Sequence, residues 1–185
     1  MNSIDANALQ ALLDKQAITE VLMRYSRAID RKDPQLLRAI YWPEATDDHL
    51  IYEGDIPGLV AFCMEFTAGM PTHHFLGNVL IELADDSNAY SETYYQAYHN
   101  IDGEGGGKED FTLLGRYLDH FQKRNGEWKM LHRTVAIDAY TRVPATSVWD
   151  SGMFAGVKTR GGPRPHDPLY RLNPLALQEY EKDKP

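Results

Sequence analysis

The sequence predicts an α+β fold in which N-terminal helices cover one side of a curled antiparallel sheet. Two observations support this prediction. Up to residue 68, apolar residues recur every three or four positions, which is typical of amphipathic helices. From Thr72 to Tyr140 they alternate with polar residues, which is typical of strands with one buried face. Helices followed by a run of long antiparallel strands indicate this fold class.

The helical part of the sequence carries start and stop signals. In the first helix an apolar residue recurs at every fourth position from Leu9 to Ile29, so this stripe is expected to face the core. Asp33-Pro34 is an N-cap followed by a proline at the first helical position, and it predicts the start of the second helix. Gly69-Met70-Pro71 ends the third. The expected helices cover residues 8–31, 34–41 and 56–68.

The second half of the sequence is divided into strands by turn residues. Asp85-Asp86-Ser87-Asn88, the run 102–108 and Arg124-Asn125-Gly126 each interrupt the alternation. A shorter strand over residues 46–52 is expected between the second and third helices. The long strands are expected over residues 72–83, 89–100, 111–123 and 128–140.

Residues 144–185 differ in character from the domain of residues 1–143. Their prolines and glycines preclude a regular element through most of the segment. Trp149, Phe154 and Tyr170 nevertheless make it too apolar for a free tail. We therefore expect this C-terminal extension to pack on the cavity mouth of its own protomer or on a neighbouring subunit.

Composition narrows the classes of partner. The formal net charge of −8 over 185 residues argues against nucleic acid or an anionic membrane as the main partner. The sequence has neither a signal-peptide pattern nor an apolar run of membrane-spanning length, so a cytoplasmic location is expected. The single cysteine, Cys63, excludes an intrachain disulfide and a cysteine-rich zinc site.

Asp30 is an acidic residue at the end of the first helix and at the edge of its apolar face. The negative end of the helix dipole and nearby apolar groups both disfavour the charged form of a carboxyl group. This position predicts a raised pKa and a role as proton acceptor. The alternative is that Asp30 is a polar residue in a solvated Asp-Arg-Lys-Asp turn, and this segment alone leaves both interpretations open.

His73 and His74 begin the first long strand. Alternation allows only one of them to point to the inner face of the sheet, and the pattern does not choose between them. A metal site is disfavoured because adjacent histidines on a strand diverge and no acidic ligand lies at a supporting spacing. The chain also lacks a phosphate-binding loop and a Gly-x-Ser-x-Gly motif. What remains is proton chemistry by Tyr, Asp and His side chains without a cofactor.

The next strand has one face of mostly small residues. Small residues on a concave face leave room for a ligand, although tight packing against a helix is an equal alternative. This face consists of Ala89, Ser91, Thr93, Tyr95, Ala97 and His99.

Three segments resemble the SnoaL-like branch of the NTF2-like superfamily. They are YSRAIDRKDPQLLRAIYWPEA from Tyr25, HHFLGNVLIEL from His73 and LGRYLDHFQKRNGEWKMLHR from Leu114. The resemblance covers about residues 9–140 and implies a cone-shaped sheet covered by helices, an NTF2-like α+β barrel. The dehydratases and dehydrochlorinases of this branch perform eliminations without a cofactor, through an Asp–His dyad inside the cone.

The resemblance also implies roles for individual residues. Asp30 matches the dyad aspartate, and His74 matches the dyad histidine because Asn78 follows it at the family's spacing. Tyr25 matches a catalytic tyrosine, and His99 a second histidine. An inward-facing Arg133 could hold an anionic part of the substrate, although a pair with Glu92 or Asp119 is the commoner arrangement. The residues expected to bind the substrate are Trp42, Tyr52, Asn78, Tyr95, His99 and Arg133.

The implied function is that of a lyase. His74, oriented by Asp30, would remove a proton from carbon next to a carbonyl or aryl ring, and Tyr25 or His99 would donate to the departing hydroxyl group or to an enolate oxygen. Ketone isomerisation or cyclisation, retro-aldol cleavage of an aromatic diol, and a non-catalytic binding role remain alternatives. The expected partner is a hydrophobic aromatic or polycyclic small molecule, and the expected assembly is a homodimer or homotrimer.

Overall fold

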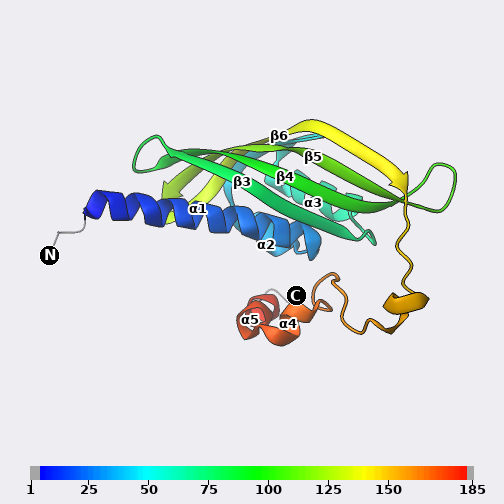
Figure 1. The fold of residues 1–185 in the computed structure, drawn as a ribbon. Coiled ribbons are helices and arrows are strands. Elements are labelled where there is room, and N and C mark those ends of the chain that lie inside the picture. The colour runs from blue at the N-terminus through cyan, green and yellow to red at the C-terminus, as the bar shows by residue number, and fades with distance from the viewer. Residues whose placement is uncertain (1–4, 183–185) are drawn as a thin grey trace.

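A computed structural model describes residues 5–182 of the chain. Its α+β architecture confirms the predicted fold class: helices lie against one face of a curled, unclosed sheet (Figure 1). The N-terminal domain contains α1 (Ala6–Asp30), α2 (Pro34–Ala39), β1 (Tyr41–His49), β2 (Tyr52–Asp55), α3 (Ile56–Phe66), β3 (Thr72–Leu83), β4 (Asn88–Asp102), β5 (Lys108–Arg124) and β6 (Glu127–Pro144). The extension contains η1 (Gly152–Gly156), α4 (Pro168–Leu172) and α5 (Pro174–Lys182).

The six strands form one sheet in the order β2-β1-β6-β5-β4-β3. Strands β3 to β6 pair antiparallel, as predicted. The prediction of a single short strand over residues 46–52 is wrong: β1 and β2 are separate antiparallel strands, and Leu50 between them has a positive φ of 59°. β1 begins at Tyr41 and also pairs parallel to β6, so α2 ends at Ala39 instead of continuing to residue 41.

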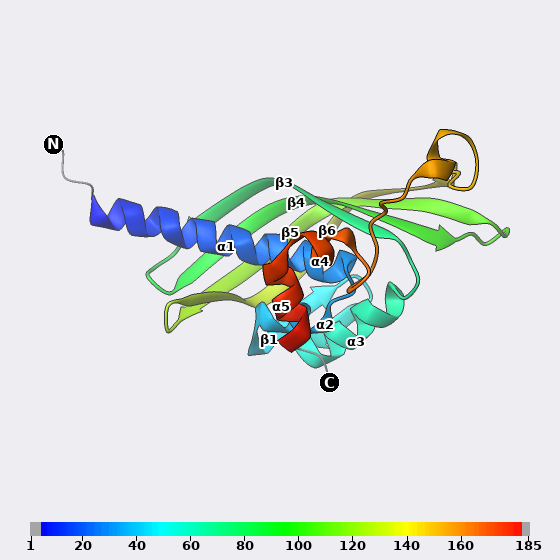
Figure 2. The same cartoon turned by 90° about the horizontal axis from the view of Figure 1, so that it is seen from below.

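Helix α1 crosses the concave face of the sheet (Figure 2). Its Asp5 N-cap accepts hydrogen bonds from the amides of Asn7 and Ala8. Ile18, Leu22 and Ala28 are at most 1% exposed and form part of the core. The expectation that the apolar stripe faces the core along the whole helix is wrong for its first turns, where Leu9, Leu12 and Leu13 are exposed. The N-terminal end of α1 extends past the sheet (Figure 2).

The two faces of β4 differ as alternation predicts. Tyr90 and Tyr94 on the outer face are exposed. The inner face is buried along its whole length: Ala89, Ser91, Thr93, Tyr95, Ala97 and His99. The sheet and the helices thus enclose a space that Tyr95, Ala97 and His99 line from the inner face of β4.

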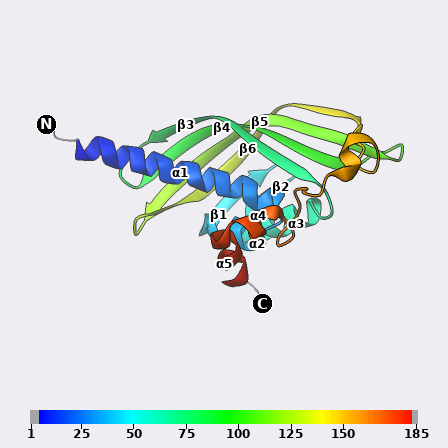
Figure 3. The ribbon, with the colours of Figure 1, turned by 60° about the horizontal axis from the view of Figure 1, so that its bottom comes forward.

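The extension returns to the C-terminal end of α1 in the same chain (Figure 3). Arg31 Nη1 contacts Asp167 Oδ2 at 2.8 Å, and the Arg164 amide donates to the Arg31 carbonyl at 2.7 Å. Arg164 also forms an ion pair with Asp33. Within residues 5–182, no helix has the length and hydropathy needed to cross a membrane.

Candidate active site

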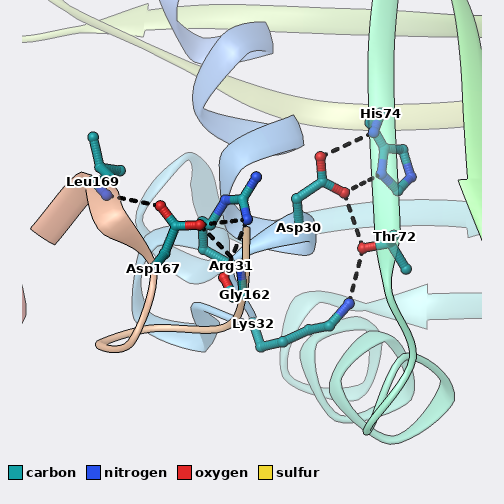
Figure 4. Close-up of polar contacts among 8 residues, drawn as sticks. All are labelled: Asp30, Arg31, Lys32, Thr72, His74, Gly162, Asp167 and Leu169. Atoms are coloured by element: carbon teal, nitrogen blue, oxygen red, sulfur yellow. Dashed lines mark hydrogen bonds and ion pairs between the residues drawn. The ribbon is translucent and has the colours of Figure 1, made fainter. Parts of the chain in front are cut away.

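Asp30 and His74 are in hydrogen-bond contact, although they are distant in the sequence (Figure 4). His74 Nδ1 lies 2.8 Å from Asp30 Oδ1, and the His74 amide donates to Asp30 Oδ2 at 2.9 Å. The side chain of Asp30 is 7% exposed and that of His74 is 6% exposed. The contact forms because the last turn of α1 packs against the start of β3, where His74 points inward and His73 is exposed.

The predicted rise in the pKa of Asp30 is wrong. Burial does raise it, but the hydrogen bond and charge of the His74 side chain, the His74 amide and the Thr72 hydroxyl together lower the pKa to about 2. Asp30 is therefore a carboxylate at neutral pH. As an acceptor it keeps the proton of His74 on Nδ1, which leaves the Nε2 lone pair free to act as a base.

His74 lines a partly enclosed cavity between the sheet and α3, which we call the cone cavity. Its volume of about 30 Å³ has room for roughly two water molecules. Phe62 and Phe66 from α3 line it and stack on each other at 5.8 Å, and Phe66 is 40% exposed, so these rings separate the cavity from solvent. The other rings with polar atoms in its wall belong to Tyr25, His49, Tyr95, His99 and Tyr117.

Four residues that line the cone cavity carry a buried polar atom with no hydrogen-bond partner among the described residues. These atoms are the hydroxyl groups of Tyr25 and Tyr95 and the Nδ1 atoms of His49 and His99. Buried polar groups are nearly always paired, so atoms of this kind indicate a place for water or a ligand. Together with His74 Nε2, they give the cavity one proton acceptor and several groups able to contact an oxygen atom.

The protonation of these groups follows from their burial. Burial raises the pKa of Tyr25 well above its usual value and that of Tyr95 to about 12, so both hydroxyl groups remain donors at neutral pH. Burial, with the nearby His74, lowers the pKa of His99 to about 4. The His99 side chain is therefore uncharged in the folded protein at pH 7.

The depressed pKa of His99 predicts a loss of stability in acid. Because the unfolded chain protonates this residue near pH 6.5 and the folded chain only near pH 4, stability falls as the pH drops through that window. Between pH 7 and pH 5 we expect protonation of this residue to lower the free energy of unfolding by about 2 kcal/mol. Urea unfolding at both pH values measures this change in the free energy of unfolding. His99→Gln should lose less stability between the two pH values than the wild type does. Equal losses in the two proteins would contradict the prediction.

Four residues predicted to bind substrate do not line the cone cavity. Asn78 is exposed, because a register shift between Leu76 and Val79 interrupts the alternation of β3. The Trp42 indole donates to the Gln122 carbonyl and lies beneath Arg124 and Lys129. Tyr52 donates to the Asp55 carbonyl and stacks on the outer side of the site against Phe62. The fourth is Arg133.

Arg133 is completely buried and paired. Its Nε and Nη2 donate to Asp119 at 2.7 and 2.8 Å, which is the cross-strand pair that the sequence offered as the alternative. Its guanidinium lies 4.1 Å from the Tyr25 ring centre and 4.0 Å from that of Tyr117. Arg133 therefore packs against the rings of Tyr25 and Tyr117, and its Nη1 atom has no hydrogen-bond partner among the described residues.

Sequence reasoning missed His49 as a site residue. His49 lines the cone cavity, and its Nδ1 lies 3.3 Å from Asp47 Oδ1. Asp47 is fully buried and accepts a hydrogen bond from the Tyr41 hydroxyl at 2.7 Å. The signal in the sequence was the i, i+2 spacing of Asp47 and His49 on one strand, but many exposed strands carry such a pair.

Comparison with known proteins identifies the family. Residues 10–134 match the model of the SnoaL-like domain. The chain belongs to the SnoaL-like family. This SnoaL-like protein is 29% identical over 133 residues to terrestric acid biosynthesis cluster protein E of Penicillium crustosum, with 68% of this chain and 83% of the relative aligned.

Solved structures with the same NTF2-like fold include two with enzyme names. A type 2 hexachlorocyclohexane dehydrochlorinase, LinA, superposes with a TM-score of 0.68 at 17% identity, covering 76% of this chain and 96% of that one. A candidate scytalone dehydratase from Novosphingobium aromaticivorans superposes with a TM-score of 0.65 at 20% identity, and the match covers 76% of this chain and 95% of that one. At these identities the likeness establishes the fold, and relatives of this family include enzymes.

Proposed function

We propose that this SnoaL-like protein is a lyase that catalyses a cofactor-independent elimination, of the dehydratase type, on a hydrophobic aromatic or polycyclic small molecule. The observation that carries the proposal is the buried Asp30–His74 pair at the wall of the cone cavity, with donor hydroxyl groups beside it. The enzyme names among proteins of the same fold support the reaction class. The relative named for a biosynthesis cluster supports a small organic molecule as the substrate.

In the proposed mechanism, His74 is the base. Its Nε2 takes a proton from carbon next to a carbonyl or aryl group, and the Asp30 carboxylate stabilises the imidazolium that forms. The C–H electron pair becomes the new C=C bond as the C–O bond to the leaving hydroxyl group breaks. The proton held on His74 then passes to the hydroxide, so the net products are the alkene and one water.

Tyr25 serves as the hydrogen-bond donor in this scheme. Its high pKa disfavours a phenolate, so the hydroxyl group stabilises negative charge on the substrate oxygen without giving up its proton. His99 and Tyr95 offer further contacts to the same oxygen or to the leaving group. Binding of a substrate requires displacement of Phe62 and Phe66, since the cavity has room for about two waters.

The low pKa of Asp30 favours this scheme over isomerisation by a lone carboxylate base. Both Asp30 oxygens are occupied by donors from Thr72 and His74. A carboxylate so stabilised is a weak base, and it is oriented toward His74 instead of the cavity. The Asp–His pair is suited to abstraction by the imidazole.

The elimination of 5-nitrobenzisoxazole tests the proposal, because it requires only a base and releases a coloured phenolate. We expect His74→Ala and Asp30→Asn to lower turnover by about 10²–10⁴-fold, the usual contribution of a positioned proton-transfer group. His73→Ala, the adjacent exposed histidine, is the matched control and should keep the wild-type rate.

All variants are also made in a Phe66→Ala background, which widens the cavity so that access of the probe does not limit the result. Equal turnover by wild type and His74→Ala in that background would refute the proposal. A panel of aryl and steroid-like β-hydroxy ketones, followed by ultraviolet absorbance, then identifies the substrate class.

A further inference from the structure

A second cavity lies on the other side of Asp30, between the end of α1 and the C-terminal extension. We call it the extension cavity. Its volume is about 490 Å³, within the range of small-molecule sites and far larger than the cone cavity. The extension supplies one wall with Trp149, Arg160 and the segment 161–163, and the turns before β3 supply the other with Met70 and Pro71.

Two cations in this wall have no carboxylate partner among residues 5–182. The Lys32 ammonium donates to the Thr72 hydroxyl at 2.9 Å and forms no ion pair in this range (Figure 4). The Arg160 guanidinium lies 3.8 Å from the Trp149 ring centre. Arg31, in contrast, is engaged by Asp167. The carboxylate that lines the cavity is that of Asp30, and both its oxygens already accept from Thr72 and His74.

The backbone at Lys32 also distinguishes this position. Lys32 follows the last turn of α1 with a φ of 54°, the left-handed conformation for which glycine is the usual residue at a helix end. Burial lowers the pKa of its ammonium group to about 8. The ammonium group reaches the Asp30 carboxylate only through the Thr72 hydroxyl. A half-buried lysine held in this conformation without a direct ion pair points to a ligand that supplies one.

We propose that the extension cavity binds a small organic carboxylate, with its charge between Lys32 and Arg160 and its apolar body against Trp149, Met70 and Pro71. The chain carries a net charge of −8, so an anion is attracted only where cations gather locally. Arg160 stacked on an indole ring keeps its edge free for carboxylate oxygens. The inference does not depend on the proposed lyase activity.

The carboxylate could be a substituent of the substrate or a separate small acid. The hydrogen-bond chain Lys32–Thr72–Asp30 connects the extension cavity to the base of the cone cavity, so either source is close to the Asp30–His74 pair. The chemistry recognised is the same for both sources.

The test is calorimetric titration with 1-naphthylacetate and its neutral amide. We expect the wild type to bind the acid at least ten times more tightly than the amide. Arg160→Gln and Lys32→Gly should each weaken binding of the acid at least tenfold. Lys32→Gly is chosen because glycine suits the left-handed backbone, so its melting temperature should equal or exceed that of the wild type. Arg38→Gln, an exposed arginine on α2, is the matched control and should bind as the wild type does.

His74→Ala separates the two cavities. Retained binding of the acid by this variant supports a site outside the cone, whereas loss would place the probe in the cone and overturn the inference. Equal binding of acid and amide, or unchanged binding by Lys32→Gly and Arg160→Gln, would also overturn it. Where His74→Ala retains binding of the acid, the kinetics of the wild type distinguish the two sources. An increase in KM for 5-nitrobenzisoxazole when the acid is present then identifies the carboxylate as a substrate substituent, and an unchanged KM identifies a separate acid.

Discussion

We expect Arg133→Met to lower the free energy of unfolding by about 3–5 kcal/mol, because it leaves the Asp119 carboxylate buried without its counter-ion. Both side chains of the pair are 0% exposed, so solvent cannot replace the lost donors. The variant also removes the cation between the rings of Tyr25 and Tyr117. Urea unfolding at pH 7 measures the change.

Two further variants show whether the loss comes from the buried pair. Arg133→Met combined with Asp119→Leu should recover much of the stability, since an apolar pair of similar volume removes the unpaired charge. Arg116→Met breaks exposed contacts with Glu92 and Asp138 and should cost far less. Similar losses for Arg133→Met and Arg116→Met would contradict the argument.

We expect Gly115→Ala to destabilise the protein by about 2–3 kcal/mol. A Cβ atom at Gly115 would lie 2.2 Å from the Ala136 carbonyl oxygen on β6 and 2.9 Å from the Tyr95 hydroxyl. The position lies at a register shift between β5 and β6, so the backbone approach is part of the sheet. Because Tyr95 lines the cone cavity, relief of the clash would also alter the cavity wall.

Gly77→Ala is the control for this substitution. Its Cβ would lie 3.7 Å from the nearest atom, an ordinary contact, and alanine is favoured over glycine inside a strand by about 0.5–1 kcal/mol. The two substitutions should therefore shift the urea midpoint in opposite directions. A shift of the same sign and size for both would show that space at Gly115 is not limiting.

Much of the fold could be predicted from the sequence because its signals are local. Alternation and turn residues give β3 its observed bounds, Thr72–Leu83, and the Asp33-Pro34 signal gives the start of α2. The sequence pattern did not distinguish β1 from β2, because β1 is stabilised by parallel pairing with β6, more than 80 residues away. No local pattern reports such a pairing.

The candidate site was less accessible to sequence reasoning. The residues themselves left His73 and His74 equivalent, and only the family resemblance favoured His74, which the structure places against Asp30. The sign of the Asp30 pKa shift was wrong because three hydrogen-bond donors on β3 could not be foreseen from the helix that carries the carboxyl group. Asn78 followed the family spacing, but the irregularity after Leu76 turns it to solvent.

The final turn of α1 has a consequence for how this chain can vary. Asp30, Arg31 and Lys32 are consecutive, and each makes its own contact: Asp30 with His74 and Lys32 with Thr72, both on β3, and Arg31 with Asp167 of the extension (Figure 4). Inserting or deleting one residue here would rotate the following side chains by about 100° and disengage all three together. Three separate contacts thus fix the length of this turn, whereas a substitution at one of these residues removes one contact and leaves the other two in place.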